Sequence, residues 1–223
     1  MRPVKLVCWD LDGTLTDSVR FVVETANTVI VGHGGTPLDY DTVGRMTGLP
    51  LEQIFRLAWP DLSDADALIY RDEYRQMYAE VAVPATRLYP GALDTVRAFH
   101  QAGLLQATVT GKQAADCERI LLGLGIREEI ELYLGGDSVP PGRTKPEPDV
   151  TLLAMERLGA RPEETVVVGD TVTDMAMGRA AGVRTIQVLW GYATEPLPEA
   201  DSVVRTWAEL RARILQSDGA LRP

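Results

Sequence analysis

Two aspartates end a hydrophobic run near the N-terminus, in the stretch VCWDLDGTLTDSV at residues 7–19. The apolar residues before them predict a buried strand over Val4–Trp9, with Asp10 and Asp12 directly after it. Side chains two residues apart on an extended chain point the same way, so we expect the two carboxylates to lie close together. Two anions about 4 Å apart repel by roughly 4 kcal/mol at an effective dielectric near 20. Water or a cation must therefore compensate for this pair.

Short apolar segments alternate with amphipathic segments along most of the chain. The apolar segments predict strands at Val4–Trp9, Leu104–Val109, Ile130–Leu134, Thr165–Val168 and Arg184–Leu189. The amphipathic segments predict helices at Leu93–Gln101, Ala114–Leu124, Val150–Leu158, Asp174–Ala181 and Trp207–Gln216. Strands that alternate with helices predict a Rossmann-like α/β core, in which a parallel sheet carries helices on both faces.

The stretch between about Val19 and Arg87 departs from that alternation. It is helical by pattern and contains no evident strand, with helical segments at residues 22–30, Leu51–Trp59 and Asp64–Val83. The simplest interpretation is an all-α helical cap inserted after the first strand. The predicted domains are residues 1–17 with 88–223 for the core and residues 18–87 for the cap.

The length and charge of the chain limit what it can bind. Its 223 residues suit one large domain or a core with a smaller insertion. The formal net charge of −10 makes it a poor candidate for binding nucleic acid or an anionic membrane surface. Asp10 interrupts the first apolar run too early for a signal peptide, and no run is long enough for a membrane span. We therefore expect a cytoplasmic protein.

Polar and charged residues lie in four loops, most of them just past a predicted strand. The loops are Asp10 to Thr14, Thr110 to Lys112, Lys145 with its neighbours in VPPGRTKPEPD, and Gly169 to Asp174. In an open parallel sheet, ligands bind at the carboxyl ends of the strands around a topological switch point. If the four loops meet there, they bring together four aspartates, a threonine hydroxyl and one or two lysines.

This set of oxygen ligands favours Mg²⁺ over Zn²⁺. Convergent carboxylates without a histidine or cysteine cluster are hard ligands, and His33 and His100 both fall outside the four loops. Cys8 and Cys117 lie far apart in apolar surroundings, which is typical of buried thiols rather than of a disulfide or a metal site. A cation would turn the repulsion between the carboxylates into shared attraction. Lysine and a threonine hydroxyl beside it would complement a phosphoryl group.

On these residues the chain resembles the haloacid dehalogenase (HAD) superfamily of hydrolases, and most of all its phosphoglycolate-phosphatase-like branch with a helical (C1-type) cap. DLDGTLTDS matches the first motif of the family, VTG the second, Lys145 of KPEPD the third and GDTVTD the fourth. The similarity covers nearly the whole chain and is looser in the cap. It implies a Mg²⁺-dependent phosphatase, monomeric or homodimeric, that acts on a small phosphorylated metabolite, with 2-phosphoglycolate as the best guess.

The resemblance also implies roles for the first two aspartates and for the metal ligands. Asp10 would be the nucleophile that forms an aspartyl-phosphate. Asp12 would protonate the leaving oxygen and then activate the water that hydrolyses this intermediate. Mg²⁺ would be held by Asp10, by the backbone carbonyl of Asp12, by Asp170, and by Asp174 directly or through water. For Asp174, an acid in the first turn of a helix is the alternative interpretation.

The remaining residues of the motifs are implied to bind the phosphoryl group. Thr110 and Lys145 would hold it and neutralise its charge, and Gly13 and Thr14 would bring the first loop close to it. Gly111 stands where many relatives have Asn or Ser, which we interpret as a change in specificity, with the backbone N–H still available.

Two basic residues are also candidates for the site, one in the predicted cap and one directly after the second motif. Arg45 is the best cap candidate to meet a substrate carboxylate or a second phosphate, with a surface arginine as the alternative. Lys112 is expected to be an exposed residue at a helix start, with contact to the substrate as the alternative.

The same residues argue against several related activities. Asp12 argues against a dehalogenase, and the absence of lysine from the cap argues against a phosphonatase. A β-phosphoglucomutase would have a cap lysine and a histidine in the first cap helix, and residues 17–31 contain neither. A broad-specificity sugar-phosphate or nucleotide phosphatase, a pyrophosphatase and, with less support, a phosphomutase remain as alternatives. Outside the enzymes, a phospho-accepting regulatory protein remains, which stable phosphorylation of Asp10 without turnover would identify.

Overall fold

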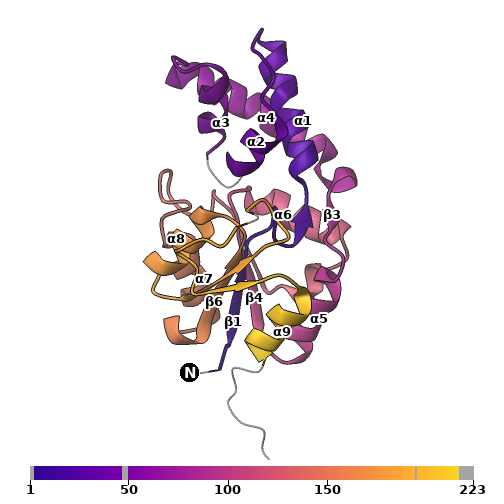
Figure 1. Cartoon of the computed structure of the whole chain (residues 1–223), viewed down its shortest axis with the longest axis vertical. Coiled ribbons are helices and arrows are strands. Elements are labelled where there is room, and N and C mark those ends of the chain that lie inside the picture. The colour runs from indigo at the N-terminus through magenta and orange to yellow at the C-terminus, as the bar shows by residue number, and fades with distance from the viewer. Residues whose placement is uncertain (1–2, 47–49, 194, 216–223) are drawn as a thin grey trace, which may run out of the picture.

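The main body of the chain is a six-stranded sheet in the order β5-β4-β1-β6-β7-β8 (Figure 1). It is seen in a computed structural model that describes residues 3–46, 50–193 and 195–215, without the side chain of Arg45. Every neighbouring pair of strands in this sheet is parallel. The strands are β1 (Leu6–Trp9), β4 (Leu105–Val109), β5 (Leu132–Leu134), β6 (Thr165–Gly169), β7 (Arg184–Val188) and β8 (Ser202–Val204).

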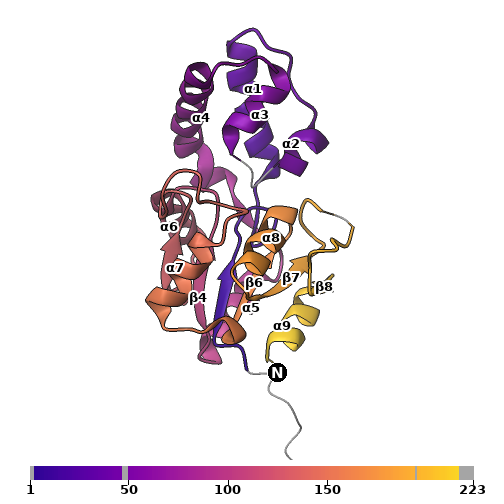
Figure 2. The same ribbon diagram turned by 90° about the vertical axis from the view of Figure 1, so that its left-hand side faces the viewer.

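Helices cover both faces of this sheet, as predicted (Figures 1 and 2). Val7 and Trp9 of β1 belong to the hydrophobic core on the side of α5, α6 and α9, whereas Leu6 and Cys8 belong to the core on the side of α7 and α8. This alternation follows from the two-residue period of a strand, and both sets are apolar because the central strand is buried on both faces. Cys8 and Cys117 are free and buried, as predicted. The helices are α5 (Ala92–Gln101), α6 (Ala114–Gly123), α7 (Asp149–Leu158), α8 (Val172–Ala180) and α9 (Trp207–Leu215), with short 3₁₀ helices η1 (Arg127–Glu129) and η2 (Pro162–Glu164).

The order of the strands places a topological switch point at β1. The chain begins at this central strand, continues to β4 and β5 on one side, and then crosses to β6, β7 and β8 on the other. Asp10 follows β1, Thr110 follows β4 and Asp170 follows β6. Because the strands are parallel, these three residues emerge at the same edge of the sheet, beside the switch point.

Four helices form a cap over this edge (Figures 1 and 2). They are α1 (Val19–Gly32), α2 (Tyr40–Met46), α3 (Leu51–Ala58) and α4 (Asp64–Ala85). Their buried residues form a separate hydrophobic core, in which the rings of Phe21 and Tyr78 stack with centroids 4.7 Å apart. Ile120 of α6 also belongs to this cluster, so the cap packs against the main body through an apolar contact.

The chain enters and leaves the cap through a two-stranded ribbon. β2 (Thr16–Asp17) and β3 (Arg87–Leu88) pair in antiparallel fashion directly before α1 and directly after α4. Ser63 caps the start of α4, and its hydroxyl accepts a hydrogen bond from the backbone N–H of Asp66 at 3.1 Å. At 22 residues α4 is a long helix, but among the described residues neither it nor any other helix is apolar and long enough to cross a membrane.

Several short elements were not predicted, among them the strand β2, which pairs with β3. α2 has seven residues with Gly44 among them, so its helical pattern is weak. β8 has three residues and forms by pairing with β7. β3 begins at Arg87, at the end of a stretch that was expected to contain no strand. Elements of this length depend on their tertiary neighbours rather than on local periodicity.

Candidate active site

Residues from three of the four predicted loops meet at the carboxyl edge of the sheet. Asp10 and Asp170 extend from the ends of β1 and β6, Lys145 comes from the loop before α7, and Asp174 lies in the first turn of α8. Lys145 Nζ lies 2.5 Å from Asp10 Oδ1 and also donates a hydrogen bond to Asp174 Oδ1. All four side chains are buried. The predicted convergence of these loops is therefore present in the structure.

Three of the aspartates form a group of the size that a metal ion requires. Asp10, Asp170 and Asp174 each offer a carboxylate oxygen, and these oxygens all lie within 4.8 Å of one another. If all three carboxylates are ionised, Lys145 balances one of the three charges and two remain. Uncompensated buried charge is costly, and a divalent cation would remove that cost. The donor set, which is entirely oxygen, suits a hard cation such as Mg²⁺.

The ionisation of these groups follows from their burial. Burial raises the pKa of Asp10 to about 7, with Lys145 opposing the rise and the charges of Asp174 and Asp12 adding to it. Burial, together with the charges of Asp174 and Asp10, raises the pKa of Asp170 well above its ordinary value. Burial by itself would lower the pKa of Lys145, but the adjacent Asp10 and Asp174 outweigh it and the pKa is raised. Without a cation, the site therefore favours a charged Lys145 and the protonated forms of Asp10 and Asp170.

Asp174 has a structural role as well as a place in the acidic group. Its Oδ2 accepts hydrogen bonds from the backbone N–H of Thr171 at 2.9 Å and from the Thr171 hydroxyl at 2.7 Å, which forms a capping box at the start of α8. Gly169 allows this approach, because a Cβ there would lie 2.4 Å from the Asp174 Cβ. The two interpretations of Asp174 made from the sequence are thus compatible.

The turn after β1 is held closely against Asp170. Gly13 has φ +82°, and a Cβ on it would lie 2.3 Å from Asp170 Oδ2. Only glycine fits both this conformation and this approach. The Thr14 hydroxyl lies 3.3 Å from Asp170 Oδ1 and 3.5 Å from Asp10 Oδ2, so it donates toward the acidic group. That Gly13 and Thr14 contact substrate stays a prediction.

A fifth loop contributes to the site and was missed in the sequence. Residues 190–192 follow β7, where the Tyr192 backbone N–H donates to Asp170 Oδ2 at 2.6 Å. Trp190 Nε1 donates to the Thr14 carbonyl at 2.9 Å, and a Cβ on Gly191 would lie 2.2 Å from the Gly13 carbonyl oxygen. The available signal was the glycine in LWGY, directly after a predicted strand, at the position where the other loops carry their functional residues.

Asp12 faces away from the acidic group, toward the cap. Its Oδ2 lies 2.6 Å from Lys112 Nζ, and its Oδ1 accepts a hydrogen bond from the hydroxyl of Ser18, next to the β2–β3 ribbon. Its carboxylate is therefore separate from Asp10, Asp170 and Asp174, which is the arrangement expected of a group that exchanges protons rather than one whose side chain binds the metal.

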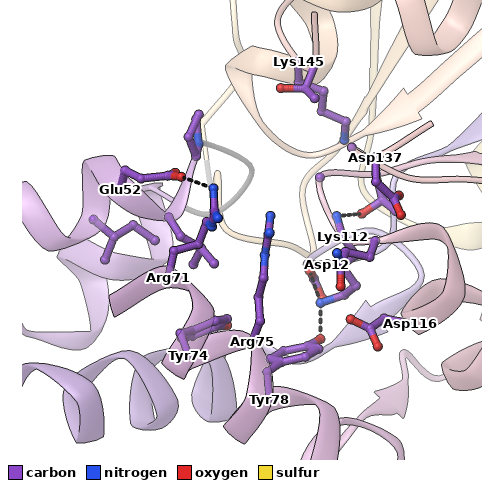
Figure 3. A pocket seen from close by; sticks show the side chains of 18 of the residues that line it. Asp12, Glu52, Arg71, Tyr74, Arg75, Tyr78, Lys112, Asp116, Asp137 and Lys145 are labelled. Carbon is purple, nitrogen blue, oxygen red and sulfur yellow. Dashed lines mark hydrogen bonds and ion pairs between the residues drawn. The ribbon is translucent and has the colours of Figure 1, made fainter. Parts of the chain in front are cut away.

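Lys112 is not the exposed helix-start residue that was expected. Its side chain is 8% exposed, and besides pairing with Asp12 its ammonium donates to the hydroxyl of Tyr78 on α4 (Figure 3). The ammonium also lies 4.3 Å from the centroid of the Tyr78 ring, within range of a cation–π interaction. The prediction was wrong because the cap covers the start of the loop, and this contact joins residues far apart in the sequence.

A cavity of about 520 Å³ lies between the acidic group and the cap. Its core wall includes the predicted residues Asp10, Asp12, Thr110, Gly111 and Lys145. Its cap wall includes Glu52 of α3 and a row of α4 side chains at residues 71, 74, 75 and 78. The side chain of Arg45, the predicted cap residue, lies outside the part of the chain that the structure describes.

Comparisons with known proteins agree with this arrangement. The sequence model of the haloacid dehalogenase-like hydrolases matches residues 7–188. The chain is 32% identical over 215 residues to a phosphoglycolate phosphatase of Chromobacterium violaceum. The alignment covers 94% of this chain and 96% of that protein. It is 30% identical over 190 residues to an N-acetylmuramic acid 6-phosphate phosphatase of Pseudomonas aeruginosa. This alignment covers 85% of this chain and 83% of that protein.

A solved structure extends the agreement to the fold. A protein of Bacteroides fragilis assigned to the haloacid dehalogenase-like hydrolases superposes with a TM-score of 0.86 at 27% identity, over 93% of this chain and 99% of that one. The match thus includes both the sheet and the cap helices. This chain belongs to the family of haloacid dehalogenase-like hydrolases.

Proposed function

We propose that the chain is a Mg²⁺-dependent phosphatase that hydrolyses a small phosphorylated metabolite through a phosphorylated Asp10. One observation carries this proposal. Asp10 lies in a buried group with Asp170, Asp174 and Lys145, while Asp12, two residues on, turns its carboxylate to Lys112 and the cavity. A nucleophile beside a cation site and a separate proton-exchanging group are the two parts that phosphate-ester hydrolysis requires.

The residues of the site each have a role in this reaction. An Asp10 oxygen attacks phosphorus, the phosphorus–oxygen bond to the leaving alcohol breaks, and Asp12 gives that oxygen its proton. Asp12 then takes a proton from a water that attacks phosphorus, which releases phosphate and restores the Asp10 carboxylate. Lys145 and Thr110 orient the phosphoryl group and balance its charge. Bound by Asp10, Asp170, Asp174 and the backbone carbonyl of Asp12, Mg²⁺ would supply further stabilisation of the charge on the phosphoryl oxygens.

The first substrate to test is 2-phosphoglycolate. The support is the relative from Chromobacterium violaceum, a phosphoglycolate phosphatase that this chain matches along nearly its whole length. A broader sugar-phosphate phosphatase is the second candidate, because a cavity of about 520 Å³ has room for a leaving group larger than two carbons and another relative acts on a phosphorylated amino sugar acid.

The test is phosphate release from a panel of phosphorylated acids, sugars and nucleotides, with Mg²⁺ or with EDTA, for the wild type and Asp10→Asn. We expect EDTA and Asp10→Asn each to reduce release by at least about 1,000-fold, because the amide is a poor nucleophile and the carboxylate is missing from the cation site. Asp94→Asn, at an exposed position on α5, is the matched control and should keep full activity.

The outcomes separate the alternatives. Release that survives in Asp10→Asn contradicts the proposed nucleophile. Activity spread evenly over sugar phosphates would keep the mechanism and replace 2-phosphoglycolate as the substrate. A phosphoryl group that stays on Asp10 without turnover would show that the chain is a phospho-accepting regulatory protein instead of a phosphatase.

A further inference from the structure

One face of α4 forms the cap wall of the cavity. Arg71 lies three and four residues before Tyr74 and Arg75, and Tyr78 lies four and three residues after them. The four side chains therefore share one face of the helix, and all four line the cavity. Tyr74 and Tyr78 are buried and stack with ring centroids 5.6 Å apart, which fixes the face of α4 that looks toward the core. Because the stacked tyrosines orient α4 in this way, Arg71 and Arg75 on the same face also lie at the cavity.

Among the described residues, four basic side chains line the cavity, and three of them are neutralised by carboxylates of the protein. Lys145 pairs with Asp10 and Asp174, and Lys112 pairs with Asp12. Arg71 pairs with Glu52 at 3.2 Å and with Asp72 at 2.8 Å.

Arg75 is different. Within the part of the chain that the structure describes, its guanidinium has no hydrogen-bond or ion-pair partner, although the residue is partly buried. Figure 3 shows it extending from α4 into the space between Arg71 and Lys112, from the side opposite Lys145. The two other acids of the wall are already engaged, because Asp116 pairs with Arg119 at 2.8 Å and Asp137 accepts the Ala114 backbone N–H at 2.8 Å.

We propose that Arg75 binds a carboxylate on the leaving group of the substrate, which makes the enzyme selective for phosphate esters of hydroxy acids over esters of neutral alcohols. A partly buried cation without a counter-ion is complementary to one anionic charge. The planar guanidinium fork matches a carboxylate in a bidentate manner. One unpaired arginine balances a singly charged carboxylate and leaves a doubly charged second phosphate uncompensated, so the carboxylate is favoured. The proposal rests on the proposed phosphatase function.

The position of Arg75 fits that function. The phosphoryl group would lie against Asp10 and Lys145 on the core wall, and Arg75 reaches the cavity from the cap wall. Asp12, which must protonate the bridging oxygen, lines the same cavity. A leaving group that extends from the core to the cap thus presents its bridging oxygen to Asp12 and its far end to Arg75.

The experiment compares two substrates of nearly the same size. One is 2-phosphoglycolate, and the other is 2-hydroxyethyl phosphate, in which a hydroxymethyl group replaces the carboxylate. The variants are Arg75→Gln, Arg75→Lys and Arg20→Gln. Arg20 is the matched control, because its loss changes the net charge equally while its side chain is 85% exposed on α1.

We expect the wild type to prefer the acid and Arg75→Gln to lose that preference. A charge-assisted bidentate contact corresponds to a fall of about 10- to 100-fold in kcat/KM for 2-phosphoglycolate, against less than about 3-fold for the neutral ester. Arg75→Lys should keep part of the preference, since it keeps the charge and loses the fork. Arg20→Gln should match the wild type on both substrates. Thermal unfolding of each variant establishes that it is folded.

Several results would overturn the proposal. If Arg75→Gln lowers kcat/KM equally for both substrates, the arginine supports the fold of the wall and not a carboxylate. If the wild type hydrolyses both esters equally well, the selectivity is absent while the phosphatase function stands. If the wild type hydrolyses neither ester nor any other member of the panel, both proposals fail together.

Discussion

Lys112 joins the core to the cap through a single ammonium group. It pairs with Asp12 at 2.6 Å on one side and donates to the Tyr78 hydroxyl on the other. Asp12 is the proposed proton donor, so the cap contacts the reacting groups through this lysine. We expect it to position Asp12, because among the described residues the ammonium has no contact with Asp10 or the other members of the acidic group.

We predict that Lys112→Met lowers kcat by about 10- to 100-fold for an alkyl phosphate, because Asp12 loses a charged partner that orients it. The effect should be several times smaller for p-nitrophenyl phosphate, whose leaving group departs without a proton. Steady-state kinetics on the two substrates measures this split, and Lys112→Arg should restore part of the loss. An equal fall on both substrates would show that the lysine supports the structure rather than the proton transfer.

The residues of the site differ in how well their positions could be predicted from the sequence. The meeting of Asp10, Asp170 and Lys145 was predictable, because chemically distinctive side chains follow apolar strands that end at one edge. Tyr192 contributes a backbone N–H, which every residue except proline possesses, so its type carries no signal. Lys112 was misjudged because its burial is caused by a helix more than thirty residues away in the sequence.

At the scale of elements, α4 of the cap packs against α6 of the core. A Cβ built on Gly123 of α6 would lie 3.8 Å from the Cβ of Val83 on α4. That separation is typical of a disulfide. The native Cys8 and Cys117 are fully buried, so they are not expected to compete for an introduced cysteine.

We predict that a disulfide in Val83→Cys/Gly123→Cys lowers turnover by at least about 10-fold, because substrate entry and product release need the cap to move about the ribbon. Dithiothreitol should restore the rate, and each single-cysteine variant should keep the wild-type rate under both conditions. The readout is phosphate release before and after reduction, with cross-linking followed by free-thiol titration. Full activity in the cross-linked form would contradict the motion of the cap.

For the whole molecule, the acidic group links stability to both pH and metal. Burial raises the pKa of Asp10 to about 7 and that of Asp170 well above its ordinary value. In the metal-free protein, the folded state therefore holds protons that the unfolded chain releases above about pH 4. This contribution to the free energy of unfolding is complete below the ordinary carboxyl pKa and is lost as pH rises through about 7. A bound cation would replace those protons.

We therefore predict that Mg²⁺ raises the melting temperature more at about pH 8 than at about pH 5. At a concentration about 100 times its Kd, the gain at the higher pH should be about 2.7 kcal/mol, or about 5–10 °C for a chain of this size. Scanning calorimetry with Mg²⁺ or EDTA measures it, and Asp170→Asn should reduce the response. An equal shift at both pH values would mean that the cation binds elsewhere.

The sequence by itself determined the α/β core, the helical insertion and the aspartates and lysine that meet at the edge of the sheet, because periodicity, strand ends and the spacing of aspartates are local properties. The tertiary structure decided which residues face those groups from outside their own loops. Arg75 enters the cavity because the stacked Tyr74 and Tyr78 orient α4, and Lys112 is buried because the cap lies over it. The physical reason is that such contacts form between surfaces distant along the chain, where packing and charge balance, rather than any local pattern, select the partner.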